Sequence, residues 1–136
     1  MCWLFQGRDV TPEDLIGFKS FVYLITNTAN GKQYVGKKKL FFTRSKLLKD
    51  RKRKIKQVKD SDWETYYGSS ESLAKDLVCF GKDVFTRETL HLCETPAKAS
   101  YYEIKEQLFR DVLLKPVEFY NSFIGCKIHR SHVLGK

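Results

Sequence analysis

Two tyrosines and a run of lysines are spaced so that they could meet at one end of a short hairpin. Tyr34 follows Tyr23 by eleven residues and directly precedes Val-Gly-Lys-Lys-Lys. A phenol has a pKa of about 10, so it accepts a proton from water near neutral pH only where its surroundings favour the phenolate. Lys37 and Lys38 are placed to provide that help. The alternative is an ordinary amphipathic hairpin in which both tyrosines are half-buried.

The hairpin that would position these phenols covers residues 21–38. Its two runs are rich in β-branched and aromatic residues, and they flank Thr-Ala-Asn-Gly, a strong turn signal. With residues 28–31 as the loop, Ile25 pairs with Tyr34. Because side chains alternate along a strand, Tyr23 and Tyr34 then share one face as diagonal neighbours.

The positive charge of the chain is concentrated in one segment. Residues 37–59 contain 12 Lys or Arg and one acid, Asp50, in a chain whose net charge is +9. A concentrated basic patch is typical of proteins that bind a polyanion, and nucleic acid is the expected partner. The alternative is a basic helix that only keeps the protein soluble. A membrane surface is disfavoured because the basic stretch places no Trp or Phe on an apolar face.

We expect this basic segment to be helical over residues 43–59. Its apolar residues fall on one stripe at 3.6 residues per turn, and Lys and Arg occupy nearly all other positions. Like charges four residues apart oppose each other in such a helix, and a bound phosphate backbone would relieve the repulsion. Arg44 would lie on the first turn, where backbone N–H groups favour an anion. The apolar stripe consists of Leu47, Leu48, Ile55 and Val58.

Capping residues and helix breakers predict the remaining elements. Three further helices, a third strand and a last extended segment are expected, and residues 40–42 are expected to enter the core. The fold class is therefore α+β, with a central three-stranded antiparallel sheet flanked by helices. The expected helices run from Thr11 to Phe18, from Ser70 to Phe80 before Gly81, and from Thr95 to a stop at Pro116; the strand covers residues 83–92 and the extended segment residues 117–124.

The helix that starts at Thr95 has two distinct faces. Its apolar residues repeat at intervals of three and four and are expected to face the core. Glu103, Gln107 and Arg110 lie together on another face, where Glu103 could be a solvated carboxylate that pairs along the helix. Asn121, further on, could equally be an ordinary turn residue. The apolar face consists of Ala97, Tyr101, Ile104, Leu108 and Val112.

Taken together, these residues resemble the signature of the GIY-YIG nuclease family. Phe-Val-Tyr ends at Tyr23, Tyr-Val-Gly begins at Tyr34, and Arg44 lies ten residues after that second tyrosine. Glu103 in a later helix and Asn121 near the C-terminus match the remaining signature positions of the family, in the same order along the chain. The resemblance covers residues 20–124 and is to the catalytic domain of phage-type GIY-YIG homing endonucleases.

The resemblance implies hydrolysis of phosphodiester bonds in double-stranded DNA. It implies that Tyr34 is the general base, that Tyr23 orients the water or the phosphate, and that Arg44 balances phosphate charge. A helical glutamate of the family holds one divalent cation, so Glu103, with Glu106 as the alternative, would bind Mg²⁺, for which Mn²⁺ can substitute. The catalytic set expected in this way is Tyr23, Tyr34, Arg44, Glu103, Asn121 and Lys38.

The expected nucleic-acid contacts come mainly from the basic segment. Trp63, Tyr66 and Tyr67 could stack on bases, although such residues are more often part of a core. Many family members carry a histidine or tyrosine at the position of Leu48, so Lys37, Lys38 or Tyr67 would have to assist the water here. The expected contacts are Lys37, Lys39, Lys46, Lys49, Arg51, Lys52, Arg53, Lys54, Tyr67 and Ser69.

Residues 1–136 are expected to form a single GIY-YIG-like domain, with residues 1–20 as an N-terminal extension and 125–136 as a basic tail. Because no DNA-reading domain follows, specificity could be low, or it could come from a homodimer, a partner protein or the basic segment. A non-catalytic module that binds DNA or RNA and retains the fold is the alternative function.

Neither an apolar run of membrane-spanning length nor a secretory signal is visible, and the scattered cysteines fit reduced thiols. A cytoplasmic location, that of the bacterial host if the gene is phage-encoded, is therefore expected. Cys126, His129 and His132 have a spacing that could serve zinc only with a fourth ligand such as His91 or Cys93, so zinc is disfavoured.

Overall fold

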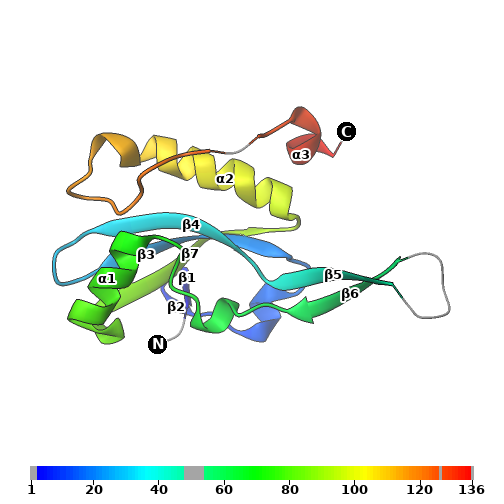
Figure 1. Cartoon of the computed structure of the whole chain (residues 1–136), viewed down its shortest axis with the longest axis horizontal. Coiled ribbons are helices and arrows are strands. Elements are labelled where there is room, and N and C mark those ends of the chain that lie inside the picture. Colours follow the sequence, from blue (N-terminus) through cyan, green and yellow to red (C-terminus); the bar gives the residue numbers. More distant parts are fainter. Residues whose placement is uncertain (1–2, 48–53, 126, 136) are drawn as a thin grey trace.

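The computed structural model describes residues 3–47, 54–125 and 127–135. Its centre is a mixed five-stranded sheet in the order β2-β1-β7-β3-β4 (Figure 1). All neighbours are antiparallel except β1 and β7, which are parallel. The strands are β1 (Leu4–Phe5), β2 (Arg8–Asp9), β3 (Ser20–Asn27), β4 (Gln33–Lys39) and β7 (Phe85–Cys93).

The predicted three-stranded antiparallel sheet corresponds to β7, β3 and β4, but the whole sheet is larger and mixed. Residues 4–9 add two strands of two residues each, which are too short to show a periodic pattern. Trp3 precedes them and is buried in the core, where its ring packs edge-on against Phe21. The helix expected up to Phe18 is a 3₁₀ helix limited to Pro12–Leu15.

The central hairpin has the predicted register. Ile25 pairs with Tyr34 and Thr26 with Gln33, while the Asn27 N–H donates to the Lys32 carbonyl oxygen over 2.8 Å. The expected alternation is also confirmed, because Phe21, Tyr23 and Ile25 contribute to one core cluster. Val22 and Leu24 contribute to the other cluster.

Two helices cover the two faces of this sheet (Figure 1). Helix α1 (Glu71–Phe80) inserts Leu73 into the cluster that contains Tyr23, and helix α2 (Pro96–Phe109) places Ala99 in the cluster that contains Val22. Their capping is as predicted, since the Ser70 and Thr95 side chains accept from the third residue of each helix. The described part also contains α3 (Arg130–Leu134) and 3₁₀ helices at Trp63–Thr65, Lys82–Val84 and Val112–Leu114.

The prediction of a helix over residues 43–59 is wrong. The segment forms two antiparallel strands, β5 (Phe41–Leu47) and β6 (Lys54–Asp60), which make a separate two-stranded sheet. A helix would have placed many like charges four residues apart around four apolar residues. A ribbon avoids that spacing, and Thr43, Ile55 and Val58 are β-branched residues that favour strands. Residues 48–53, which include Leu48, lie outside the described residues.

The apolar stripe predicted for the helix that starts at Thr95 is only partly buried: Val112 lies in the core, but the other positions are half-buried or exposed. Ser100 and Gln107 are buried, whereas 61% of Leu108 is exposed, and the helix ends at Phe109 rather than at Pro116. Ala99 of α2 packs in the apolar cluster, whereas the buried Gln107 lies at the edge of strand β4 and donates to its backbone, which needs hydrogen-bond partners there. Of residues 40–42, only Leu40 is fully buried; Phe41 and Phe42 are exposed.

No helix in the described part of the chain is both long and apolar enough to cross a membrane.

Candidate active site

Tyr23, Tyr34 and Gly36 form one packed unit on the sheet. Tyr23 pairs with Gly36 in the β3–β4 register, and the two tyrosine rings lie 6.2 Å apart between centroids. A Cβ atom added to Gly36 would lie 2.6 Å from Cζ of Tyr23 and 3.0 Å from Cε2 of Tyr34. Only glycine therefore lets both rings lie against β4, which explains the Tyr-Val-Gly order in physical terms.

The outer edge of β4 is covered by residues that are distant in sequence. The Gln33 N–H donates to the Glu118 carbonyl, and the Val35 N–H donates to Oδ1 of Asn121 over 3.0 Å. The Lys37 backbone N–H acts to lower the pKa of the Glu103 carboxyl, against the effect of burial. Two successive outward N–H groups of the strand, those of Gln33 and Val35, thus have partners that are distant in sequence.

Asn121 is not an ordinary turn residue. It is 8% exposed, and its Nδ2 also donates to the Val35 carbonyl over 2.8 Å, so its side chain pairs with β4 as a neighbouring strand would. Gln107 of α2 donates to the same carbonyl over 3.1 Å. These bonds hold the C-terminal segment and α2 against the strand that carries Tyr34.

A hollow of about 490 Å³ opens at this edge, and we call it the site hollow. Tyr34 reaches it from one face of the sheet and Glu103 from the helix on the other face. The start of α1 borders it, and the Tyr34 hydroxyl lies 3.2 Å from Oγ of Ser69. Its lining residues are Tyr34, Lys37, Ser69, Ser70, Glu71, Ser72, Glu103, Gln107, Tyr120, Asn121, Ser122, Phe123 and Gly125.

Burial opposes charge on the acidic groups of the site. It raises the pKa of the Tyr34 phenol above its ordinary value, although a hydrogen bond with Ser69 acts in the other direction. It also raises the pKa of the Glu103 carboxyl, against the lowering effect of Lys37. The expectation that lysines favour the Tyr34 phenolate is therefore not met in the protein alone.

Tyr23 lies deeper than Tyr34. It is 1% exposed, and burial raises the pKa of its phenol well above the usual range. Its ring packs edge-on against Trp3 and Tyr66. In this structure Tyr23 supports Tyr34 from the core and does not line the site hollow.

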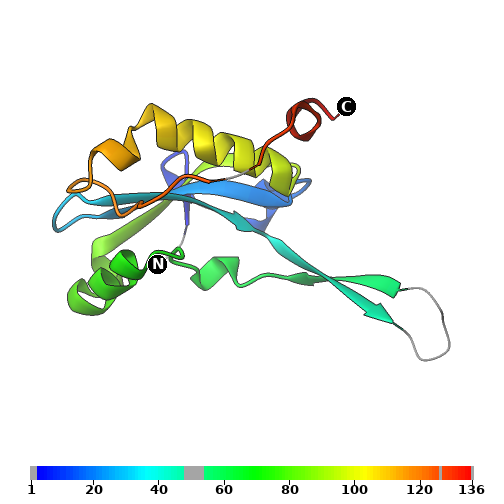
Figure 2. The ribbon, with the colours of Figure 1, turned by 45° about the horizontal axis from the view of Figure 1, so that its top comes forward.

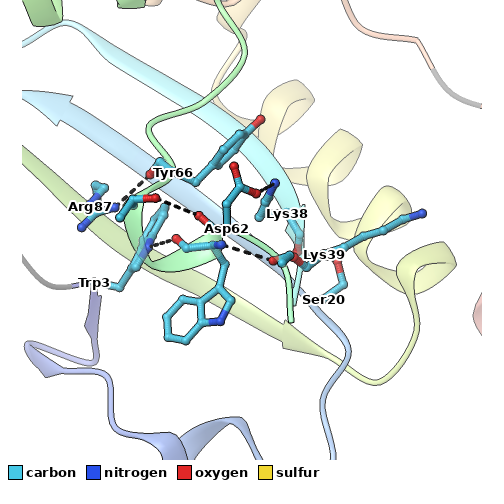
Figure 3. Close-up of polar contacts among 10 residues, drawn as sticks. Trp3, Ser20, Lys38, Lys39, Asp62, Tyr66 and Arg87 are labelled. Carbon is cyan, nitrogen blue, oxygen red and sulfur yellow. Dashed lines mark hydrogen bonds and ion pairs between the residues drawn. The ribbon is translucent and has the colours of Figure 1, made fainter. Parts of the chain in front are cut away.

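Lys37 and Lys38 have different surroundings. The Lys37 ammonium donates to Oγ of Ser100 and lines the site hollow. Lys38 instead forms a 2.6 Å ion pair with Asp62, and its ammonium lies 4.1 Å from the centre of the Tyr66 ring (Figure 3). Lys37 is thus the lysine that shares the hollow with Tyr34 and Glu103.

The remaining candidates lie along or near the basic ribbon. Arg44 and Lys46 are in β5 and Lys54 is in β6, so Arg44 does not lie at a helix N-terminus. Lys39 is exposed at the end of β4. Lys49, Arg51, Lys52 and Arg53 lie outside the described residues.

The aromatic residues after the ribbon belong mostly to the core. Trp63, Tyr66 and Tyr67 pack against the cluster that contains Tyr23. The Tyr67 ring also faces the buried guanidinium of Arg87, whose carbon lies 4.2 Å from the ring centre. These contacts favour the core interpretation over base stacking.

The residues of the site hollow fit a cation that is held largely by water and substrate. The described residues contain no group of three or more His, Cys, Asp or Glu side chains placed for a metal. Glu103 offers a hard oxygen ligand in a place where burial disfavours its charge, and a bound cation would offset that cost. Magnesium commonly uses one or two carboxylates together with phosphate and water.

The alternative metal ligands are engaged elsewhere or undescribed. Glu106 bonds to His91 over 2.9 Å and to Arg110, so it does not share the hollow with Glu103. His129 pairs with Ser131 and His132 in the cap of α3. Cys126 lies outside the described residues.

Ser69 was expected near the site, but the first residues of α1 that follow it, and Gln107, were not predicted as parts of the site. The cap formed by Ser70 was recognised, but nothing in the local sequence shows that this helix N-terminus faces Tyr34. A signal was present in Gly68, whose φ of +88° and short approach to the Tyr34 ring require glycine next to the cap.

A protein-family model matches most of the chain. The family is described as "Putative endonuclease segE, GIY-YIG domain", and the match covers residues 3–124. It therefore includes both tyrosines, Glu103 and Asn121. Comparison with curated proteins and with solved structures gave no match.

Proposed function

The chain belongs to the GIY-YIG endonuclease family, and from that premise we propose that it is a metal-dependent endonuclease or nickase that hydrolyses phosphodiester bonds in double-stranded DNA. The observation that carries the proposal is the site hollow, in which Tyr34, Lys37 and Glu103 meet the start of α1. A phenol can take a proton from water, an ammonium and a helix N-terminus can bind phosphate oxygens, and a carboxylate can hold a cation, so together these groups can support hydrolysis of a phosphodiester.

Tyr34 is the proposed general base. It is half-buried, lines the hollow, and its hydroxyl is held by Ser69. Tyr23 is proposed as a positioning residue, because its ring fixes the Tyr34 ring over Gly36. A general base of this kind contributes about 10²–10⁴-fold to a rate.

The proposed phosphate contacts come from two sides of the hollow. Lys37 provides a positive charge, and the first N–H groups of α1 face the same space through residues 69–72. Arg44 is proposed to balance charge on the non-bridging oxygens, from the strand that follows β4. These groups bind and orient the phosphate without proton transfer.

Glu103 is the proposed ligand of one Mg²⁺, with Mn²⁺ as a substitute. When bound, this cation supplies positive charge to phosphate oxygens and lowers the pKa of a bound water. Asn121 holds the C-terminal segment that borders the hollow against β4. It thereby keeps the hollow between Tyr34 and Glu103 in its shape. Its role is to position the site.

Plasmid relaxation tests the proposal. We expect the purified protein to nick or linearise supercoiled DNA with Mg²⁺ and not with EDTA. Tyr34→Phe and Glu103→Gln should each lower the rate by about 10²-fold or more. Tyr101→Phe and Glu88→Gln, which make the same chemical changes outside the hollow, should leave it unchanged. Salt-sensitive DNA binding without cleavage under any divalent metal would instead favour a non-catalytic binding module.

A further inference from the structure

The two-stranded ribbon of β5 and β6 stands apart from the rest of the fold, and we call residues 41–47 and 54–60 the arm. Figure 2 shows it extending away from the sheet and from both α1 and α2. Among the described residues, its strands pair only with each other, from Phe41 opposite Asp60 to Leu47 opposite Lys54. Seven residues per strand give a length of about 23 Å.

Large apolar side chains are exposed at the positions of the arm whose burial is described. Val58 is 68% exposed and Phe42 is 45% exposed. An isolated two-stranded hairpin is marginally stable in water, so a ribbon of this kind gains stability from whatever it contacts. The question is therefore which partner its chemistry fits.

The positive charge of the arm fits a polyanion as its partner. Its two strands contain five Lys or Arg and one acid, Asp60. Two copies of this arm would repel each other, whereas phosphate groups on both sides of a DNA groove would offset the repulsion. The basic residues are Arg44, Lys46, Lys54, Lys56 and Lys59.

The base of the arm is fastened to the sheet that carries Tyr34. Lys38 of β4 pairs with Asp62 (Figure 3). The Ser61 N–H donates to the Leu40 carbonyl over 2.9 Å. The Trp63 N–H donates to Oγ of Ser61, and Nε1 of Trp3 donates to the Trp63 carbonyl over 2.7 Å. Both strands therefore leave the domain from an ordered root, and DNA held by the arm has a defined position relative to the site hollow.

From this shape, charge and attachment, we propose that the arm binds double-stranded DNA by lying in its major groove. That groove is about 12 Å wide and admits a two-stranded β-ribbon, whereas the minor groove is about 6 Å wide. The proposal rests on the proposed function for its partner, double-stranded DNA, and adds the element and the groove through which the DNA is held.

Binding measurements without Mg²⁺ test the arm separately from cleavage. The triple variant Lys54→Gln/Lys56→Gln/Lys59→Gln should weaken binding to a 30-base-pair duplex, measured by fluorescence anisotropy. The plot of log affinity against log salt should become less steep by about 2 to 3, because each lost phosphate contact changes the slope by about 0.9. The matched control is Lys105→Gln/Lys115→Gln/Lys98→Gln, which removes the same charge from α2 and the segment after it.

Dimethyl sulfate footprinting identifies the groove. We expect the parent protein to protect N7 of guanines, which lies in the major groove, and the arm variant to lose that protection. Protection confined to N3 of adenines, in the minor groove, would overturn the proposal. So would an arm variant with the same salt slope as the lysine control.

The two proposals fail in different ways. If the parent protein binds DNA and protects guanine N7 but never cleaves, the proposed nuclease activity is contradicted and the proposal that the arm binds DNA stands. If the parent protein cleaves, and the arm variant binds and cleaves DNA like the lysine control, only the proposal that the arm binds DNA is contradicted. Circular dichroism of each variant establishes that the domain is folded in every comparison.

Discussion

The ring of Tyr23 occupies the space that a side chain on Gly36 would need. The two residues are register partners on β3 and β4, and Cζ of Tyr23 lies 2.6 Å from the position of a Cβ atom on Gly36. The second ring, that of Tyr34, approaches the same position, with its Cε2 atom 3.0 Å away. The two tyrosines and the glycine of the signature are thus one packing unit, whatever chemistry Tyr34 performs.

Gly36→Ala should destabilise the fold by about 1–3 kcal/mol. The added methyl group overlaps backbone-anchored aromatic rings, and overpacking in a filled core has that magnitude. The measurement is urea unfolding followed by circular dichroism. Gly125→Ala is the control, because its Cβ would meet Phe123 at an ordinary 3.7 Å. Equal midpoints for Gly36→Ala and the parent would show that the rings can move aside.

Asn121→Ala should also cost about 1–3 kcal/mol, for a different reason. It removes both hydrogen bonds to Val35 and leaves a buried N–H group of β4 without its acceptor. Hydrogen exchange should show faster exchange of the Val35 amide, with little change at Leu24 in the centre of the hairpin. Ser122→Ala, one residue on and exposed, is the control. Unchanged protection at Val35 would contradict the pairing described here.

Local signals predicted the parts of the fold that depend on neighbouring residues. The Asn-Gly turn sets the hairpin register, and Ser70, Gly81 and Thr95 mark helix ends through bonds within a few residues. These interactions do not depend on the rest of the chain. They therefore appear in the structure as the sequence indicated.

The errors concern features that depend on distant partners. The arm exists because residues 41–47 pair with residues 54–60, and a stripe of four apolar residues suited a helix as well as a ribbon. Gln107 of α2 is buried because it donates to the Val35 carbonyl of β4, and the sequence of the helix alone does not reveal that contact. The residues of the site were identified by resemblance, and their common hollow only by the fold.

Glu103 and Glu106, one turn apart on α2, should respond oppositely to replacement by Gln. Burial raises the pKa of Glu103, so its charged form is disfavoured in the folded protein. Glu103→Gln should therefore raise the melting temperature at pH 7. This gain should vanish as the pH falls below the pKa of the unfolded chain, where both states are protonated.

For Glu106, burial opposes ionisation, but hydrogen bonds from His91 and Arg110 outweigh it and lower the pKa. Glu106→Gln should lower the melting temperature at pH 7, because a stabilised charge is lost. That difference should disappear as the pH falls through the folded-state pKa, when the parent carboxylate itself becomes protonated. Thermal melts of the parent, Glu103→Gln and Glu106→Gln at pH 3 and pH 7 test both predictions. Melting-temperature shifts of the same sign for the two variants at pH 7 would contradict the opposite pKa shifts.

The cleavage rate should rise with pH if Tyr34 is the base. Burial raises the pKa of its phenol above 10.0, so the neutral form dominates at pH 7 and the phenolate fraction grows tenfold for each pH unit below the pKa. We expect log kcat/KM to rise with a slope near 1 from pH 7 to pH 9 at saturating Mg²⁺. Tyr34→Phe should lower the rate by about 10²–10⁴-fold and lose this slope.

Tyr101→Phe, at a half-buried tyrosine of α2 that does not line the site hollow, is the control and should keep both the rate and the slope. The decisive comparison is the pH profile of Tyr34→Phe, measured with enough enzyme to detect its residual cleavage. If that variant is slow but keeps the slope of the parent, the titrating group is another one, and Tyr34 acts by holding the water or the phosphate. If the parent profile is flat over this range, proton removal by Tyr34 does not limit the reaction.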